Sequence, residues 1–203
     1  MTVPHREPHK PSFRATSKDA LLLVLRPLVR WLSIMRVRPD TLTVAGWTLA
    51  LGSAVLFGVG YARIAGIVML LGGLFDALDG AVARESNRIS SFGAFLDSTL
   101  DRLSESAVFV GLIFFYASAA RPFETLLAGV AMTFSLLTSY ARARAEGLGI
   151  ACEVGLLERA GRIVILSVLS ILGLPTIGLG LVAAGALITT AQRMLHVRRA
   201  TRG

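Results

Sequence analysis

The residues best suited to chemistry in this sequence are four aspartates near the end of a long apolar run. Asp76 and Asp79 follow the run IAGIVMLLGGLF, and Asp97 and Asp101 come shortly after them. A carboxylate in a membrane-like environment is costly and generally has a function. Four carboxylates this close repel one another and need a cation as partner. Because histidine and cysteine are absent from this stretch, we expect an oxygen-binding ion such as Mg²⁺, Mn²⁺ or Ca²⁺ rather than zinc.

Helical spacing predicts that these carboxylates converge. Four positions share one face of a first helix at i, i+3, i+4 and i+7: Asp76, Asp79, Gly80 and Ala83. Three positions share one face of the next helix at i, i+4 and i+8: Gly93, Asp97 and Asp101. The loop between the two helices is short, so the helices are expected to be antiparallel neighbours. The aspartates would then meet near one end of a helical bundle.

Other interpretations of this stretch are weaker. An EF-hand alternates its ligands along a polar loop, which this stretch does not do. Small residues at helical spacing often mean close packing only, and we adopt that interpretation for four other glycines: Gly72, Gly73, Gly178 and Gly180. At Gly80 and Gly93 the missing side chains lie on the faces that carry the carboxylates. A bulky group such as a nucleotide could approach the backbone there, with Arg84 as a phosphate ligand.

The whole pattern resembles the signature of the CDP-alcohol phosphotransferase family. The matching stretch is Asp76-x2-Asp79-Gly80-x2-Ala83-Arg84-x8-Gly93-x3-Asp97-x3-Asp101. The resemblance implies a phospholipid-synthesising enzyme that moves the phosphoryl-lipid portion of a CDP-linked lipid, such as CDP-diacylglycerol, to an alcohol and releases CMP. It assigns Mg²⁺ or Mn²⁺ to Asp76, Asp79, Asp97 and Asp101, with Asp101 also the candidate base. It assigns the nucleotide to Gly80, Ala83, Arg84 and Gly93, and it implies a homodimer.

Arginines later in the chain indicate the acceptor alcohol. The SY-x-basic, ER-x-x-R and QR stretches resemble the branch of the family that makes phosphatidylinositol phosphate or its archaeal-lipid counterpart. The matching residues, expected to bind a small phosphorylated alcohol such as inositol phosphate, are Arg142, Arg159, Arg162 and Arg193. An arginine at the end of a membrane helix can hold an anionic group in this way.

The elements that must position these residues are membrane helices. Hydrophobic residues make up 54% of the 203-residue chain, and the charges cluster between long apolar runs. We predict an all-α integral membrane protein with six transmembrane helices in one domain over 38–203. The spans are expected at about 41–60, 62–83, 91–117, 122–146, 155–173 and 175–196. Before them we expect a cytosolic tail over 1–16 and an interfacial amphipathic helix over 17–37, which carries arginines and a tryptophan.

The basic residues predict how the bundle is oriented. Among the 21 lysines and arginines, only Arg63 and Arg121 fall in the loops on one side, and Arg102 lies within a span. The others lie on the opposite side, which by the positive-inside rule is cytoplasmic. This places both termini and the aspartates at the cytoplasmic face of the cell membrane. The net charge of +8 therefore reflects topology and anionic lipids. The basic residues lack the interleaved aromatics of a nucleic-acid surface.

Three alternatives remain. A phosphatidylglycerophosphate or phosphatidylserine synthase would share the donor and metal site and differ in the acceptor pocket. An ion transporter would need carboxylates distributed across the membrane depth. A polyprenyl transferase would be expected to have two separated aspartate-rich motifs and a longer chain.

Overall fold

The structure is a computed structural model that describes residues 25–86 and 90–202, and every regular element within them is helical. Residues 25–34 form the end of a first helix. Six further helices follow: α2 (Pro39–Gly58), α3 (Ala62–Glu85), α4 (Ser91–Ser118), α5 (Pro122–Glu146), α6 (Arg159–Ile171) and α7 (Pro175–Ala200). The predicted tail over 1–16 and the first part of the predicted interfacial helix, 17–24, lie outside the described residues.

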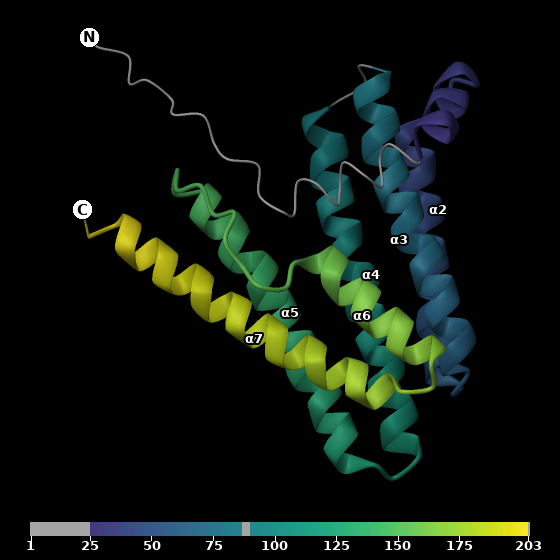
Figure 1. The fold of residues 1–203 in the computed structure, drawn as a ribbon, viewed down its shortest axis with the longest axis vertical. Helices are drawn as coiled ribbons and strands as arrows, with labels where there is room; N and C mark the ends of the chain where they lie inside the picture. The colour runs from purple at the N-terminus through teal and green to yellow at the C-terminus, as the bar shows by residue number, and fades with distance from the viewer. Residues whose placement is uncertain (1–24, 87–89, 203) are drawn as a thin grey trace.

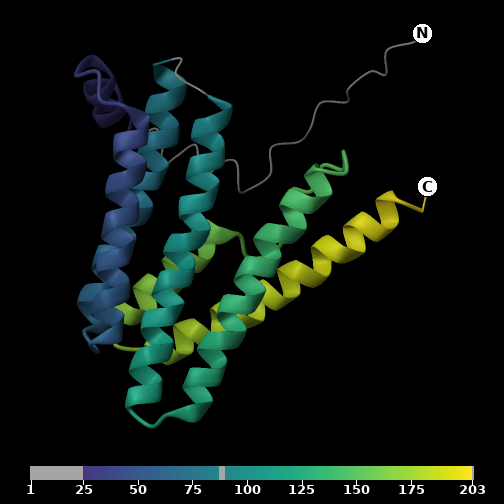
Figure 2. The same ribbon diagram turned by 180° about the vertical axis from the view of Figure 1, so that it is seen from behind.

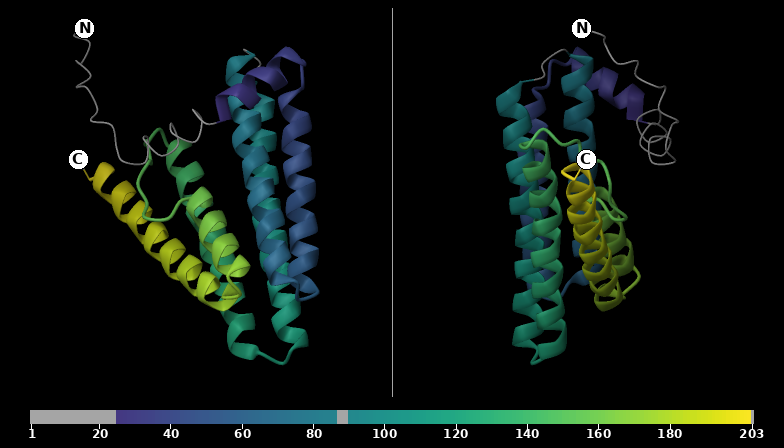
Figure 3. Two further views of the ribbon diagram at one scale, coloured as in Figure 1. Left: turned by 45° about the vertical axis from the view of Figure 1, so that its right-hand side comes forward. Right: turned by 90° about the vertical axis from the view of Figure 1, so that its left-hand side faces the viewer.

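The helices form two groups that diverge towards one end of the molecule (Figure 1). Helix α2 packs on α3 and α4, α5 packs on α7 and α4, and α6 packs on α3 and α7. Figure 2 shows the α2–α3–α4 group from behind, and in Figure 3 the pair α5 and α7 leans away from it. We call the end at which the two groups converge the closed end and the end at which they diverge the open end. The turns α2–α3, α4–α5 and α6–α7 lie at the closed end, and the end of α3 and the start of α4 lie at the open end (Figure 1).

Proline marks the start of three helices. Pro39, Pro122 and Pro175 each stand at the first position of a helix, in α2, α5 and α7. The first helical position has no intrahelical use for its N–H, so the missing proton of proline costs nothing there. In α2, Asp40 lies in the same first turn, where the positive end of the helix dipole stabilises its negative charge.

Four helices have the length and composition of membrane spans: α2, α3, α5 and α7. Helix α4 has 28 residues and is long enough, but three carboxylates lie within its first 15 residues: Asp97, Asp101 and Glu105. Helix α6 has only 13 residues, or about 20 Å of rise, against a hydrocarbon layer of about 30 Å. Six spans were predicted, and four of them are confirmed as candidates by length and composition.

The predicted span over 155–173 begins too early. Helix α6 starts at Arg159, and the segment before it is an irregular loop over 147–158. This loop is apolar because it packs on α7: Cys152 is fully buried, and the Leu157 N–H donates to Thr189 Oγ1 at 2.8 Å. The residues Gly155, Leu156 and Leu157 are as apolar as the helix that follows them, so the sequence pattern did not separate the end of the loop from the span.

Small residues bring the site helices close together. A Cβ on Gly111 of α4 would lie 2.2 Å from the Ala54 carbonyl oxygen of α2. A Cβ on Gly66 of α3 would lie 2.6 Å from the Ser167 carbonyl oxygen of α6. Among the glycines assigned to packing, a Cβ would come within 3.4 Å of an atom of a neighbouring helix at three: Gly72, Gly73 and Gly178. Gly180 has no such neighbour within 4 Å, so that assignment was wrong within this chain.

Candidate active site

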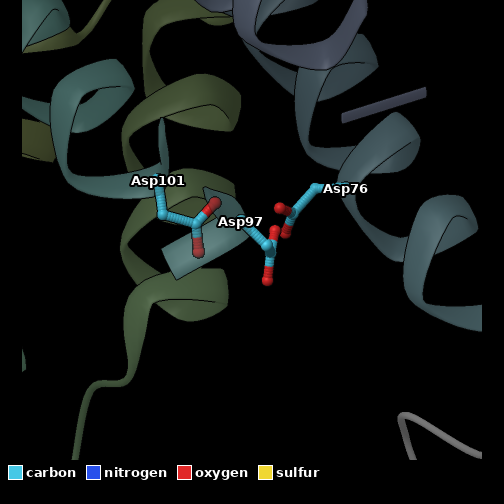
Figure 4. A group of neighbouring side chains, drawn as sticks. All are labelled: Asp76, Asp97 and Asp101. Atoms are coloured by element: carbon cyan, nitrogen blue, oxygen red, sulfur yellow. The ribbon is translucent and has the colours of Figure 1, made fainter. Parts of the chain in front are cut away.

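Three of the predicted carboxylates form one group between α3 and α4. Asp76, Asp97 and Asp101 each contribute an oxygen that lies within 4.8 Å of the other two. Figure 4 shows the three side chains pointing toward one another, Asp76 from α3 and the other two from α4. All three are partly buried, so their mutual repulsion is poorly screened by water. An all-oxygen donor set of this kind fits Mg²⁺ or Mn²⁺.

The fourth carboxylate lies beside this group rather than inside it. Asp79 is 5% exposed and accepts a hydrogen bond of 2.5 Å from Thr43 Oγ1 on α2. It lines a pocket together with Asp97. Thr43 was not singled out from the sequence. The available signal was its hydroxyl, which does not distinguish it from Thr41, Thr48 and Ser53 of the same helix.

Arg159 joins the two helices that carry the carboxylates. Its Nη1 lies 2.8 Å from Asp76 Oδ2, and its Nη2 lies 2.8 Å from Asp101 Oδ1. As the first residue of α6, Arg159 therefore links α6 to both α3 and α4. The sequence predicted Arg159 as an acceptor ligand. The structure places its guanidinium against two of the carboxylates expected to hold the metal.

A second arginine of α6 is paired more deeply. Arg162 Nε and Nη2 donate to Glu105 Oε1 and Oε2 at 2.6 and 2.9 Å. The two side chains are 2% and 5% exposed. Glu105 was missed in the sequence, although its position continues the i, i+4 series of Asp97 and Asp101 on α4.

The residues that the resemblance assigned to the nucleotide line one pocket of about 280 Å³ at the start of α2 and α4 and the end of α3. We call it the α2–α4 pocket. These residues are Gly80, Ala83, Arg84 and Gly93. Gly93 is also constrained locally, because its N–H donates to Ser90 Oγ at 2.9 Å in the cap of α4. A Cβ on Gly93 would lie 2.9 Å from that hydroxyl oxygen.

The four predicted acceptor arginines line a separate pocket of about 260 Å³, which we call the α5–α7 pocket. Asp76 and Asp101 border this pocket, whereas Asp79 and Asp97 border the α2–α4 pocket. The aspartates therefore stand between two pockets that have no lining residue in common. The structure thus gathers the residues predicted for the nucleotide around one pocket and the residues predicted for the acceptor around the other.

Two of the arginines hold the α5–α7 pocket in different ways. Arg193 is buried, and its Nε and Nη1 donate to the carbonyl oxygens of Val154 and Thr138 at 2.9 and 2.6 Å. It therefore ties the loop over 147–158 to α5 and α7. Arg142 is exposed at the mouth, and its Nε lies 2.8 Å from Glu146 Oε1 one turn along α5.

Comparisons with known proteins agree with this geometry. Residues 36–194 match a family model described as CDP-alcohol phosphatidyltransferase. The archaetidylinositol phosphate synthase of Methanothermobacter thermautotrophicus is 35% identical over 191 residues, covering 88% of this chain and 95% of that protein. The phosphatidylinositol phosphate synthase of Mycobacterium tuberculosis is 34% identical over 189 residues, covering 88% and 87%.

Solved structures of the Mycobacterium tuberculosis phosphatidylinositol phosphate synthase resemble this fold. The form with CDP-DAG bound has a TM-score of 0.75 at 33% sequence identity and covers 84% of this chain and 92% of that chain. The form in complex with manganese and citrate has a TM-score of 0.77 at 33% identity and covers 85% and 88%.

Proposed function

Because this chain belongs to the CDP-alcohol phosphatidyltransferase family, we propose that it transfers a phosphatidyl-type group from CDP-diacylglycerol to inositol phosphate and releases CMP. The protein is a multi-pass membrane enzyme, and we place its active site at the cytoplasmic face. The observation that carries the choice of acceptor is the α5–α7 pocket, where five arginines, Arg102 and the four predicted ones, line a space beside Asp76 and Asp101. A phosphorylated alcohol suits that charge, whereas serine brings no phosphate.

The donor belongs on the other side of the carboxylates. The α2–α4 pocket is bordered by Asp79 and Asp97, and the side-chain-free faces of Gly80 and Gly93 leave room for a nucleotide. Arg84 is exposed at the edge of this pocket, where it can contact a phosphate. The lipid chains would remain in the bilayer while CMP leaves into water.

The carboxylates would hold Mg²⁺ or Mn²⁺: Asp76, Asp79, Asp97 and Asp101. Such an ion neutralises phosphate charge and helps CMP to depart. Asp101 lines the acceptor side, so we assign it the proton of the attacking hydroxyl. The hydroxyl oxygen forms a bond to the phosphorus that bears the diacylglycerol, and the bond from that phosphorus to the CMP oxygen breaks. Arg142, Arg159 and Arg193 orient the acceptor phosphate.

An acceptor panel tests the proposal. Purified protein would be incubated with CDP-diacylglycerol, Mg²⁺ and either inositol phosphate, inositol, glycerol 3-phosphate or serine, and the lipid product identified by mass. We expect phosphatidylinositol phosphate, no product in EDTA, and recovery with Mg²⁺ or Mn²⁺. A product from glycerol 3-phosphate or serine, with inositol phosphate inert, would overturn the acceptor and leave the reaction type standing. A product in EDTA would overturn the metal requirement. Size measurement in detergent would test the homodimer that we also propose.

A substitution at the pocket mouth tests the acceptor site separately. Replacing Arg142 by alanine removes a charge-assisted contact of about 1.5–3 kcal/mol, so acceptor kcat/KM should fall about ten- to a hundredfold. The KM for the CDP-lipid should hardly change. Arg121→Ala is the matched control, because Arg121 is exposed at the closed end and pairs with Glu124. An unchanged acceptor KM in Arg142→Ala would show that Arg142 does not bind the acceptor.

A further inference from the structure

The ion pair between Arg162 and Glu105 is the most deeply buried charged contact at the site. Two hydrogen bonds of 2.6 and 2.9 Å join the guanidinium of α6 to the carboxylate of α4. A third hydrogen bond runs from Arg162 Nη1 to the Leu157 carbonyl oxygen at 3.3 Å. Both arginines line the α5–α7 pocket, but the side chain of Arg162 is 2% exposed and that of Arg159 is 22% exposed, so Arg162 is the less accessible of the two to a substrate phosphate.

The pair is one of two arginine–carboxylate pairs that join α6 to α4. On α4, Asp101 and Glu105 are four residues apart, and on α6, Arg159 and Arg162 are three residues apart. Residues at these spacings share a helix face. The observed register pairs Arg159 with Asp101 and Arg162 with Glu105. If Arg159 moved from Asp101 to the next carboxylate along α4, it would pair with Glu105 instead.

Glu105 is within reach of Arg159. Both residues line a small internal cavity of about 30 Å³, together with Asp76 and Asp101. The Nε of Arg159 is buried and has no hydrogen-bond partner, so this guanidinium still has a donor to offer. A buried carboxylate that has lost its own cation is strongly unfavourable and would attract the nearest one.

We propose that Arg162 is a positioning residue. By pairing with Glu105, Arg162 keeps Arg159 paired with Asp76 and Asp101, where Arg159 can contact the acceptor. Arg162 then acts through Arg159 and does not itself touch the acceptor phosphate. The role assigned to Arg159 here depends on the proposed function, whereas the competition between its two possible carboxylate partners does not.

A pair of variants separates this role from a direct contact. In Arg162→Met, Glu105 loses its partner and draws Arg159 away, so acceptor kcat/KM should fall about tenfold or more, the effect of losing one charge-assisted contact. In Glu105→Met/Arg162→Met the competing carboxylate is gone as well. Replacing both partners of a buried ion pair by apolar residues is often neutral for stability. This double variant should therefore recover acceptor KM to within about threefold of the wild type.

Measurements of acceptor KM, CDP-lipid KM, kcat and Tm on the three proteins decide the question. Recovery in the double variant, with the CDP-lipid KM unchanged throughout, supports the proposal. A double variant as poor as Arg162→Met would mean that Arg162 contacts the acceptor itself, and the proposal would be overturned. An Arg162→Met variant with wild-type acceptor KM would overturn it too. If Arg162→Met does not fold, Arg162→Gln takes its place, because glutamine keeps a polar side chain in the buried space but leaves Glu105 without a cation.

A crystal structure of the single variant provides a readout that needs no substrate. The proposal expects the Arg159 guanidinium to be hydrogen-bonded to Glu105 in Arg162→Met and to Asp101 in the double variant. Arg159 remaining on Asp101 in the single variant would contradict the proposal. If wild-type protein did not use inositol phosphate, the proposed function would fail, and this structural comparison would still test the competition between the carboxylates.

Discussion

Asp101 is the residue at which the parts of the site meet. It belongs to the carboxylate group with Asp76 and Asp97, accepts a 2.8 Å contact from Arg159, and borders the α5–α7 pocket. Asp79 borders the α2–α4 pocket, against Thr43 of α2. Carboxylates of one motif can therefore serve different steps, because two of them border one pocket and two border the other.

Asn substitutions should separate these steps. Asp101→Asn removes the proposed base and one negative charge, so turnover should be lost while CDP-lipid binding is largely kept. Asp76→Asn and Asp79→Asn should lose both turnover and binding, because these residues are expected to hold the metal that grips the pyrophosphate. Product formation by mass and CDP-lipid binding by calorimetry would measure the two properties.

Glu124→Gln is the matched control for these substitutions. Glu124 lies at the closed end and pairs with Arg121, away from both pockets, so its variant should keep both properties. Substantial turnover by Asp101→Asn would exclude Asp101 as the base.

Because helical spacing fixes the faces of α3 and α4, the sequence predicted that the four aspartates converge; three of them form one group, and Asp79 lies beside it. Through the family resemblance the sequence also grouped four residues that are now found among those lining the α2–α4 pocket: Gly80, Ala83, Arg84 and Gly93. It could not predict Thr43 or Glu105 as partners, or the contacts of Arg159. Those depend on how far α2 and α6 are rotated and shifted against α3 and α4, and spacing within one helix carries no information about that.

Among the helices, α4 has the most demanding position, since it contacts both α2 and α5 and carries two of the grouped aspartates. Its approach to α2 depends on Gly111, where backbone meets backbone at Ala54. In membranes, small residues allow such close approach and direct van der Waals packing of the helices. The position of Asp97 and Asp101 therefore depends on a residue on the same helix, about three turns away.

A methyl group at Gly111 should loosen this contact. In Gly111→Ala the new Cβ would lie 2.2 Å from a carbonyl oxygen, so α2 and α4 must separate. We expect a loss of about 1–3 kcal/mol in stability, typical of overpacking, seen as a lower Tm in detergent. Gly129→Ala is the matched control, because Gly129 of α5 has no such neighbour within 4 Å.

That control variant should be as stable as the wild type or slightly more stable, because alanine is the better helix former. Equal Tm values for the two variants would show that the α2–α4 contact tolerates a methyl group.

Helix α6 shows what an apolar pattern leaves undetermined. The predicted span begins at residue 155, yet residues 155–158 belong to the loop over 147–158, in which Leu157 bonds to Thr189 of α7. What keeps it there is tertiary contact, including Arg193 to Val154 and His196 to the Ala151 carbonyl oxygen at 2.9 Å. These contacts join segments about 40 residues apart, beyond the reach of any local pattern.

At the scale of the whole molecule, the basic residues are distributed unevenly between the two ends of the bundle. The closed end carries the three short turns, with Arg63 and Arg121 near them. The open end lies between the α2–α3–α4 group and the α5–α7 pair (Figure 3). Basic residues stand at the end of α5, the start of α6 and the end of α7. From the positive-inside rule we propose that the open end is the cytoplasmic one.

Cysteine labelling of intact cells tests this orientation. In a Cys152→Ala background, single cysteines at Ala62 and Ala120 should react with an impermeant reagent, because both lie at the closed end. A cysteine at Ile150, in the loop over 147–158, should react only after the cells are opened. Labelling of Ile150→Cys in intact cells would reverse the orientation.

The separation of the two pockets also bears on the stereochemistry of the proposed reaction. Donor and acceptor would lie in different pockets, each bordered by two of the four motif aspartates, so both can be bound at the same time. An acceptor oxygen arriving from the α5–α7 side can approach phosphorus opposite the departing CMP, and no side chain has to carry the lipid phosphate in between. A single in-line displacement of this kind inverts the configuration at phosphorus. Its initial-rate plots for the two substrates would intersect rather than run parallel.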